Sequence, residues 1–570
     1  MATDDKAAEM AEMVETVATT NISVSIASQE VEDRHVSFRL IIITAAVTGV
    51  YLATIVHIVG SGLLARSIVA AIGGSDKVAW LTIVVTFHPI LLGPPVAQAA
   101  DLWGRKWFIV VAMLAGTVGC LIVSRANTIG VAIAGQAIAG FNQTAQGLSH
   151  AIVSEILPRR YRPWAQAGIH VAAGLGALLG LYVGGAMCRN SPEGFRNYWY
   201  LTASLFCTVG CIIAIFYNPP LRQLQHLNVA EKIRRFDLPG TFLLIIALLG
   251  ICLGLGWSQN PYTWRNAHIL TPFIIGITGL VFLIIYYTQF KKDGIIHHEL
   301  FQGSRNFVIA LICIFAEGVS FFAANNYFGF QVGFLFDRDL LLTGATYSIT
   351  WITYMIGTLI AGWYCSRTAT LKLPVIISFV SFIIFFALMI SVQLSSGTMV
   401  WGYGVFLGIG LGISLNALVV VAQLSIPPQL IATGTSLMLA IRAAGGTVGL
   451  AIYNAVFNAA LSNNLGPKIS QAALSQGLPS SSLPQLINAL AHEDYAAVQS
   501  VPGITPAIIQ ASVVALKNAF NVGFRNIYIT ALASGIVALI ASFFLRDRKE
   551  EFTYSIDAPM TEKKVKDIQE

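Results

Sequence analysis

Long apolar runs alternate with short polar segments along almost the whole chain. Fourteen of these runs are long enough to cross the roughly 30 Å hydrocarbon core of a bilayer as helices. They lie near residues 40–60, 80–100, 107–123, 129–156, 164–187, 198–217, 238–257, 269–288, 307–329, 345–364, 374–394, 400–424, 432–459 and 527–545. The pattern predicts an all-α membrane protein with fourteen transmembrane helices, grouped as six, two and six.

This grouping predicts how the chain is divided. A first six-helix bundle covers 38–218, two linker transmembrane helices follow within 219–300, and a second six-helix bundle covers 301–548. A Ser- and Pro-rich stretch at about 463–519 is expected to be a long loop of the second bundle. The polar ends, 1–37 and 549–570, have few apolar residues to bury and are expected to be disordered tails.

The charge content indicates a membrane environment, and the positions of the charges indicate the orientation of the chain in it. Only 11% of the 570 residues are charged, whereas soluble proteins carry roughly 25%. The net charge of +6 resides mainly in short loops, so we expect no nucleic-acid partner. The positive-inside rule then predicts that both termini are cytosolic and that 463–519 is extracellular. The cations on the inner side are Arg105, Lys106, Arg159, Arg160, Arg162, Arg222, Lys232, Arg234, Arg235, Lys291, Lys292, Arg305, Arg367 and Lys372.

A charged turn separates the second and third spans. It contains Asp101, Gly104, Arg105 and Lys106 within six residues. Asp101 can accept hydrogen bonds from the amides that start the next helix, or it can pair with Arg105. Gly104 permits the tight backbone that a short turn needs. A hinge at the inner membrane face is one interpretation, and a solvated turn that only orients the chain is the other.

Glycines recur every four residues along the fifth span, at Gly176, Gly180 and Gly184, with Gly185 beside the last. Such a stripe lets a neighbouring helix approach closely or slide. Static packing of small residues is the alternative.

The two motifs and the layout together resemble the major facilitator superfamily, in particular its fourteen-span drug:proton antiporter branch. The segment 97–106 follows that branch's G-x-x-x-D-x-x-G-R-[RK] motif with alanine in place of the first glycine, and 176–185 follows its G-x-x-x-G-P-x-x-G-G motif with Leu181 in place of proline. Finer features resemble the group of fungal trichothecene efflux pumps and siderophore-type transporters. They include Ser154-Glu-Ile-Leu-Pro158 and Asp237-Leu-Pro-Gly240.

The resemblance implies alternating access of two six-helix halves around a central site. It implies that Asp101, Gly104 and Arg105 latch the inner face, and that Gly180, Gly184 and Gly185 pack between the halves. Members of this branch often carry an acid in the first helix and an arginine in the fourth. This chain has Leu52 and Gln136 near those places, so proton coupling must use other groups.

Ionisable residues inside spans are costly in lipid and are therefore functional candidates. Glu317 and Arg442 each lie roughly 16 Å into a helix that starts on the inner side, so they can form an ion pair. We hypothesise that Glu317 takes part in proton coupling while Arg442 tunes it; a fixed structural pair is the alternative. Among the lone histidines, His57 is a further candidate because the first helix lines the pathway in this family; a satisfied structural role is the alternative for each of these histidines.

Polar and aromatic residues mark two helix faces. Phe321 and Asn325 follow Glu317 at intervals of four, and Gln136 and Gln143 lie along one side of the fourth span. Amides that orient and rings that give bulk would suit an amphiphilic organic solute. Hydrogen bonding between helices is the alternative for the fourth span.

These observations favour a secondary transporter that exports small amphiphilic organic compounds, such as toxins or drugs, by proton antiport. Uptake of an iron–siderophore complex is the alternative, and a non-transporting receptor of the same fold is a third. No catalytic set, metal-ligand pattern or phosphate-binding loop is visible in the sequence, so we expect no enzyme activity, metal or cofactor. We expect a monomer in the plasma membrane, with the vacuolar membrane as the alternative.

Overall fold

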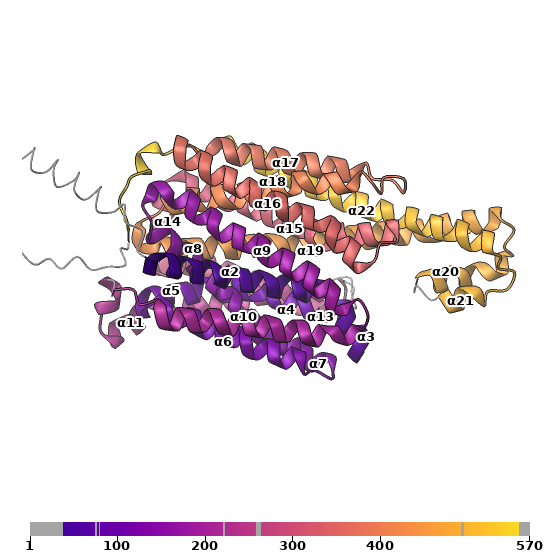
Figure 1. The fold of residues 1–570 in the computed structure, drawn as a ribbon, viewed down its shortest axis with the longest axis horizontal. Helices are drawn as coiled ribbons and strands as arrows, with labels where there is room; N and C mark the ends of the chain where they lie inside the picture. Colours follow the sequence, from indigo (N-terminus) through magenta and orange to yellow (C-terminus); the bar gives the residue numbers. More distant parts are fainter. Residues whose placement is uncertain are drawn as a thin grey trace, which may run out of the picture.

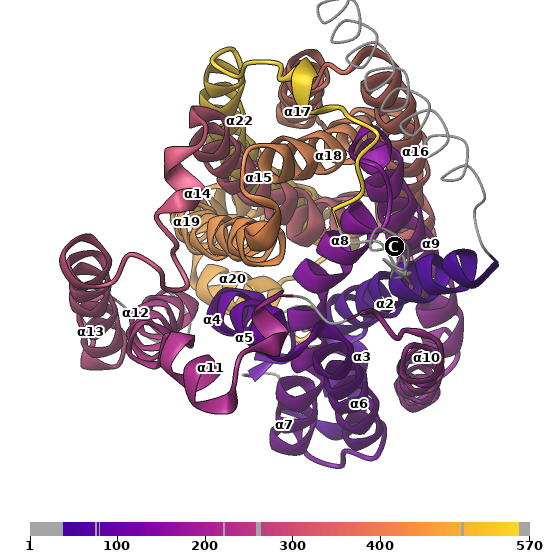
Figure 2. The same ribbon diagram turned by 90° about the vertical axis from the view of Figure 1, so that its left-hand side faces the viewer.

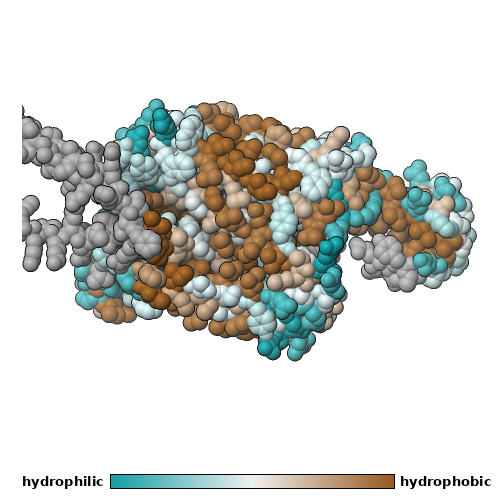
Figure 3. All heavy atoms as spheres, in the orientation of Figure 1, coloured by the Kyte–Doolittle hydropathy of each residue, from teal (hydrophilic) through white to brown (hydrophobic). Residues whose placement is uncertain are grey.

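Helices account for nearly all of the regular structure in the computed structural model, which describes residues 38–74, 77–78, 80–220, 223–257, 264–491 and 495–557. Eleven helices in this part of the chain are long and apolar enough to cross a membrane, or twelve if one bent pair counts as a single span. Figure 3 shows an apolar band across the molecule with hydrophilic residues at both ends of it. The predicted tail 1–37 lies outside the described residues.

The first group of helices packs around α2 and α9. Helix α9 lies against α2, while α10 contacts both α2 and α6, and α6 contacts α7. The helices of this group are α2 (Phe38–Leu63), α3 (Ala65–Ile72), α4 (Trp80–Leu91), α5 (Gly93–Trp103), α6 (Arg105–Ser124), α7 (Ile129–Gly140), α8 (Ala145–Glu155), α9 (Arg162–Cys188) and α10 (Phe195–Phe216).

Two of the expected continuous spans are broken. Helices α4 and α5 meet at an angle of 47° where Pro89 precedes Gly93-Pro94-Pro95, because proline removes backbone donors from the helix. Helices α7 and α8 are separated by a 3₁₀ turn at Phe141–Thr144. Side chains compete with the helical bonds there, since Asn142 bonds the Ala139 carbonyl and the Thr144 hydroxyl donates to the Phe141 carbonyl over 2.9 Å.

A pair of helices, α12 (Leu238–Trp257) and α13 (Ala267–Ile285), lies beside the first group. It follows the short surface helix α11 (Val229–Arg235). Helix α12 contacts α4 of the first group and α19 of the second, as Figure 2 shows in end view. The buried carboxylate of Asp237 anchors this pair by accepting hydrogen bonds from the Gly240 amide (2.9 Å) and the hydroxyls of Tyr286 (3.0 Å) and Tyr287 (2.7 Å).

The second group packs around α15, α18 and α19. Helix α19 contacts α15 and α22, α17 contacts α18 and α22, and α16 contacts α18. Helix α16 also lies along α9 of the first group and so joins the two groups. The helices of this group, with the short α14 (Glu299–Gln302) before them, are α15 (Arg305–Phe336), α16 (Leu340–Thr368), α17 (Lys372–Ile390), α18 (Val400–Leu424), α19 (Ile431–Ser475) and α22 (Pro506–Ser542).

The stretch 463–519, expected to be a loop, is mostly helical. Helices α19 and α22 both extend into it and project beyond the bundle, where they carry α20 (Leu483–Ala491) and α21 (Tyr495–Gln499) (Figure 1). These elements share a separate apolar cluster that includes Ile469, Leu486, Ile508 and Leu516. The apolar residues are spaced to bury one another between helices, and this favours helices over an irregular loop.

Both ends of the described chain lie on the same face, at the left of Figure 1. We call it the tail face; it carries the starts of α2, α6 and α9 and the ends of α5, α8 and α22. Residues 549–557, which we expected to belong to a disordered tail, are held on this face by contacts described below. Residues 558–570 lie outside the described residues.

Gly276 offers a test of the α12–α13 packing. A Cβ atom at Gly276 would contact the backbone of Ile251 and lie 2.8 Å from the Ala247 carbonyl oxygen, so Gly276→Leu must push the two helices apart. Such overpacking costs about 1–3 kcal/mol. We expect a lower midpoint of thermal unfolding in detergent. Gly402→Leu is the control, because nothing lies within 4 Å of a Cβ at that position; equal midpoints for the two variants would contradict the packing.

Candidate functional site

A pocket lies between the two groups of helices. Its walls come from α2, α4, the α7–α8 turn, α8 and α9 on one side and from α15, α16, α18 and α19 on the other. We call it the central pocket. Most of its lining is apolar or aromatic, and the polar and aromatic residues among its lining include Tyr51, Gln143, Gln146, Phe321, Phe322, Asn325, Trp351, Tyr354 and Arg442. Three of the predicted cavity residues therefore line this pocket: Gln143 on the side of the first group, and Phe321 and Asn325 on the side of the second.

An ion pair joins Arg442 and Glu317 at this pocket. The Arg442 guanidinium donates to the two Glu317 carboxylate oxygens over 2.6 Å and 3.0 Å, and it lies 4.6 Å from the centre of the Phe321 ring. Glu317 is fully buried. The matching depth that the sequence indicated therefore corresponds to a real contact. A buried charge needs such a partner because desolvation would otherwise be very unfavourable.

Glycines let α15 and α19 come close enough for this pair. A Cβ atom at Gly318 would collide with the carbonyl oxygen of Arg442, and one at Gly445 would collide with that of Phe315. Larger residues at either position would separate the two helices. The glycines beside the ion pair thus fix the distance across which Arg442 reaches Glu317.

Two N–H donors in the pocket wall have no hydrogen-bond partner among the described residues. They are Gln143 Nε2 and Trp351 Nε1. The side-chain oxygen of Gln143 accepts a hydrogen bond from the amide nitrogen of Gln146, and this fixes which end of the Gln143 amide is the unpartnered nitrogen. Asn325 contacts the hydroxyl of Tyr347 over 3.3 Å. A buried donor without a partner is unfavourable, so these two groups favour a ligand that brings hydrogen-bond acceptors.

His57 and Gln136 do not lie in the lining of the central pocket. His57 is fully buried within the first group and contacts Gln136 Oε1 over 2.9 Å and Asn142 Nδ2 over 3.1 Å. An amide oxygen only accepts and an amide nitrogen only donates, so both ring nitrogens of His57 are satisfied in the neutral form. Trp199 and Phe206 pack on its ring. This arrangement favours the structural alternative for His57 and the hydrogen-bonding alternative for Gln136.

The charged turn on the tail face is a buried cluster rather than a solvated loop. Asp101 belongs to the last turn of α5 and Arg105 to the first turn of α6, and Gly104 connects them with φ of 99°. Arg105 binds Asp101 (2.8 Å from Nη2) and also Glu155 at the end of α8. The pairing alternative for Asp101 is therefore the one observed. Sequence reasoning missed Glu155, which lies fifty residues from Arg105.

This cluster also reaches the second group of helices. The Thr433 hydroxyl of α19 donates to Asp101 Oδ2 over 3.2 Å. Lys106, by contrast, points outward and contacts Asn218 over 2.6 Å. Gly104 has a backbone conformation that other residues rarely adopt, so the one-residue connection between α5 and α6 depends on it.

The glycine stripe of α9 packs mainly within the first group. A Cβ at Gly176 would lie 2.6 Å from the Leu52 carbonyl oxygen, and Gly180 and Gly184 face Val59 and Leu63 of α2. Gly185 faces Leu341 of α16, in the second group. The expectation that Gly180 and Gly184 pack between the halves therefore differs from the structure. They allow α2 and α9 to approach each other.

Direct hydrogen bonds close the tail face between the two groups. Asn416 of α18 donates to the Pro163 carbonyl over 2.9 Å, and Ser366 of α16 donates to the Arg160 carbonyl over 2.6 Å. The Arg162 guanidinium donates to the Gln423 carbonyl over 3.2 Å. The first and second groups are thus held together below the central pocket, on the side of the tails.

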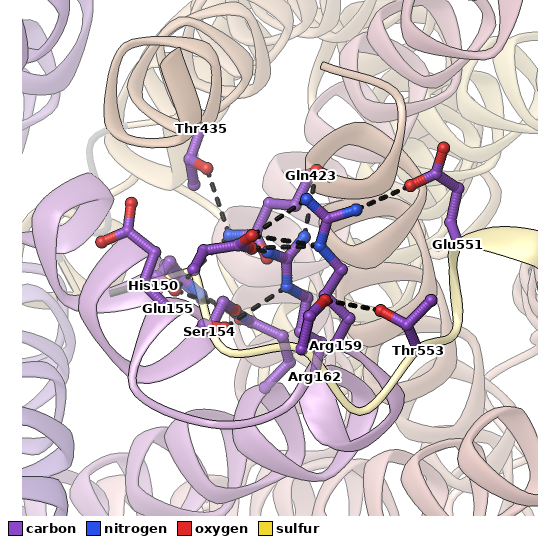
Figure 4. A network of polar contacts seen from close by, with 12 residues as sticks. His150, Ser154, Glu155, Arg159, Arg162, Gln423, Thr435, Glu551 and Thr553 are labelled. Atoms are coloured by element: carbon purple, nitrogen blue, oxygen red, sulfur yellow. Dashed lines mark hydrogen bonds and ion pairs between the residues drawn. The ribbon is translucent and has the colours of Figure 1, made fainter. Parts of the chain in front are cut away.

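Residues 546–557, which we call the C-terminal strap, bind both groups. Figure 4 shows Glu551 and Thr553 of the strap beside Arg159 of the first group. Arg159 pairs with Glu551 (2.8 Å) and Asp557 (2.9 Å), and Arg162 also pairs with Asp557. The backbone amide of Arg160 donates to the Thr553 carbonyl over 2.9 Å. These contacts attach the strap to the loop between α8 and α9.

The same strap is anchored on the second group. Asp547 accepts hydrogen bonds from the amides of Leu371 (2.7 Å) and Lys372 (3.0 Å) at the start of α17, and Arg548 donates to the Leu424 carbonyl over 3.2 Å. A carboxylate at a helix start is favourable because of the free amides and the helix dipole. The strap therefore bridges the two groups on the tail face.

A model of the Major Facilitator Superfamily matches residues 37–450. The MFS-type transporter ucsD of an Acremonium species is 23% identical over 69% of this chain, and the match covers 66% of that protein. The trichothecene efflux pump TRI12 of Fusarium sporotrichioides is 21% identical, over 79% of this chain and 76% of the pump. The fold is similar to that of a bacterial homologue of the human lysosomal transporter Spinster, solved in an inward-facing and unoccupied conformation. The match covers 91% of this chain and 99% of that chain, with a TM-score of 0.51 and 15% sequence identity.

Asp557→Asn tests the strap. Losing this carboxylate leaves Arg159 and Arg162 with fewer partners, so we expect the tail face to open more often. Ser436→Cys in a cysteine-free background is the reporter, since Ser436 is 2% exposed where α19 meets Gly147 of α8. We expect Asp557→Asn to raise the rate of maleimide labelling several-fold.

Glu550→Gln is the matched control for the strap, because the Glu550 carboxylate pairs with Arg548 of the same segment. It should leave the labelling rate unchanged. A strap that contributes nothing to closure would give the same labelling rate in Asp557→Asn as in the parent protein.

Proposed function

Since the chain belongs to the Major Facilitator Superfamily, we propose that it is a secondary transporter that exports small amphiphilic organic compounds by alternating access, driven by proton antiport. The observation that carries this proposal is the central pocket, whose walls come from both groups of helices and contain the Arg442–Glu317 pair. Relatives named as efflux transporters support the outward direction.

The proposed topology has fourteen spans, arranged as six, two and six. Eleven spans are the long apolar helices, and the bent α4–α5 pair is the twelfth. The interrupted pair α7 and α8 counts as the thirteenth span, and the continuous helix α16 is the fourteenth. The positive-inside rule supports a cytosolic tail face, which carries Arg105, Arg159 and Arg160. We place the protein in the plasma membrane as a monomer.

The substrate class follows from the pocket's chemistry. Aromatic rings from Tyr51, Phe321 and Trp351 offer apolar contact, while Gln143 and Trp351 offer unpaired N–H donors. Arg442 is already neutralised by Glu317, so a net charge on the ligand is not required. A largely apolar molecule with carbonyl, ether or hydroxyl oxygens fits this combination.

The energy source we propose is the proton gradient. Glu317 and Arg442 take part in coupling because they place charge directly at the pocket, where a ligand can alter their environment. His57 contributes to structure rather than to coupling, because both of its ring nitrogens are occupied.

Deletion of the gene tests export. We expect the deleted strain to be hypersensitive to part of a panel of oxygen-rich apolar toxins and to accumulate more of these compounds inside the cell. A protonophore should raise accumulation in the parent strain to the level of the deleted strain. Reduced growth only on iron–siderophore media would contradict export and support uptake, and unchanged accumulation of every compound would contradict transport of this class.

Glu317→Gln tests the role of the ion pair. The neutral amide leaves Arg442 buried with its charge uncompensated, and breaking such a pair typically costs about 3–5 kcal/mol. We expect gradient-driven transport to fall at least tenfold in vesicles, with folded protein verified by gel filtration. Glu193→Gln is the control, because Glu193 is an exposed acid paired with Arg196 far from the pocket. Full pH-driven transport by Glu317→Gln would contradict a coupling role for the pair.

A further inference from the structure

His150 occupies a position between the central pocket and the closed tail face. It lies in the middle of α8 and is fully buried. Its carbonyl oxygen accepts a hydrogen bond from Gln423 of α18, over 3.4 Å, and Gly147 one turn earlier faces Ser436 of α19. His150 is thus on the surface along which the first and second groups meet, so separating the groups at the tail face would expose it to water.

The hydrogen bonds of Gln166 fix the protonation pattern of the His150 ring. Gln166 Nε2 donates to the His150 carbonyl (3.1 Å) and to the Ser154 hydroxyl (2.6 Å), which turns Gln166 Oε1 toward His150 Nδ1. An amide oxygen only accepts, so Nδ1 carries the hydrogen in the neutral ring. The other nitrogen, Nε2, has a free lone pair and no hydrogen-bond partner among the described residues.

The unpartnered Nε2 distinguishes His150 from His57. Both imidazoles are fully buried, but in His57 one nitrogen contacts Gln136 and the other contacts Asn142. Adding a proton to His57 would force Nδ1 to point a hydrogen at the Asn142 amide nitrogen, which is itself a donor. Adding one to His150 breaks no hydrogen bond, because Nε2 is the free site.

Aromatic residues connect His150 with the pocket. The Tyr51 ring lies edge-on at 5.0 Å between ring centres, and the His170 ring lies at 5.4 Å. His170 Nδ1 in turn bonds the Tyr354 hydroxyl over 2.8 Å, and its Nε2, like that of His150, has no hydrogen-bond partner among the described residues. Tyr51 and Tyr354 both line the central pocket, so only the Tyr51 side chain separates His150 from a ligand that would bind there.

The charges that face His150 come from several helices. Arg442 of α19 lies in the pocket wall, and Glu317 of α15 neutralises that cation. At the far end of α8, Arg105 and Glu155 are paired with each other. A proton on His150 would add a second buried positive charge near Arg442, so an ionised Glu317 and access to water both favour the protonated form.

We propose that His150 binds the transported proton on Nε2, an inference that rests on the proposed antiport. In the arrangement described, where His150 is fully buried, the imidazole is neutral. Opening the central pocket toward either side of the membrane lets water approach Nε2, and the ring exchanges its proton with the compartment to which it is exposed. In each cycle one N–H bond forms at Nε2 on one side of the membrane and breaks on the other, and no other covalent bond changes.

The first test needs neither a substrate nor transport. Because protonation and hydration of His150 favour each other, acid should open the tail face. We expect maleimide labelling of Ser436→Cys, divided by the rate for the denatured protein at each pH, to rise several-fold between about pH 8 and about pH 5.5. His150→Gln should remove this rise and His57→Gln should keep it. A rise that survives in His150→Gln, or no rise in the parent, would overturn the assignment.

A second measurement covers the case in which His150→Gln fails to fold. Exchange of the histidine C2 hydrogen in deuterated buffer, followed by mass spectrometry of the parent protein, reports water access to each imidazole. We expect faster exchange at His150 than at His57; equal rates would overturn the proposal. Failure of the proposed function gives a different result, namely no gradient-driven transport by a parent protein that still shows the acid-induced opening.

Discussion

The Arg442–Glu317 ion pair is the interaction on which the central pocket depends. It brings a full positive charge into a largely apolar and aromatic wall, and this is tolerable because the carboxylate accepts two hydrogen bonds from the guanidinium. The pair also dictates the local backbone, since Gly318 and Gly445 must leave room for α15 and α19 to approach. A ligand that contacts Arg442 therefore acts on an element shared by two helices of the second group.

Polar contacts on the tail face perform a different task. They join the first group to the second through Asp101 and Thr433, through the loop at Arg159 and Arg162, and through the strap that ends in Asp557. Each contact is a direct hydrogen bond or ion pair between two particular groups. Together they define one arrangement, with the tail face closed, that can be replaced by a second arrangement in which these contacts are broken.

The sequence predicted the helices well and their partners only in part. Residues a few positions apart could be related by spacing, as for Asp101 and Arg105, and depth alone brought Glu317 and Arg442 to the same level. Depth along a helix does not give the direction in which a side chain points. For that reason His57, a candidate for the pathway, lies inside the first group. Glu155 appeared only as part of the motif Ser154-Glu-Ile-Leu-Pro158, and spacing could indicate neither its pairing with Arg105 nor the contacts of the strap, because these depend on distant segments.

Reconstitution into liposomes shows whether protons drive transport through the central pocket. The probe is the compound to which deletion of the gene causes the greatest sensitivity. With an acidic lumen, we expect the probe to accumulate in the vesicles several-fold above the level at equal pH. The lumen should become less acidic as it does so, and a protonophore should abolish both changes. Equal accumulation with and without the gradient would contradict proton-driven transport.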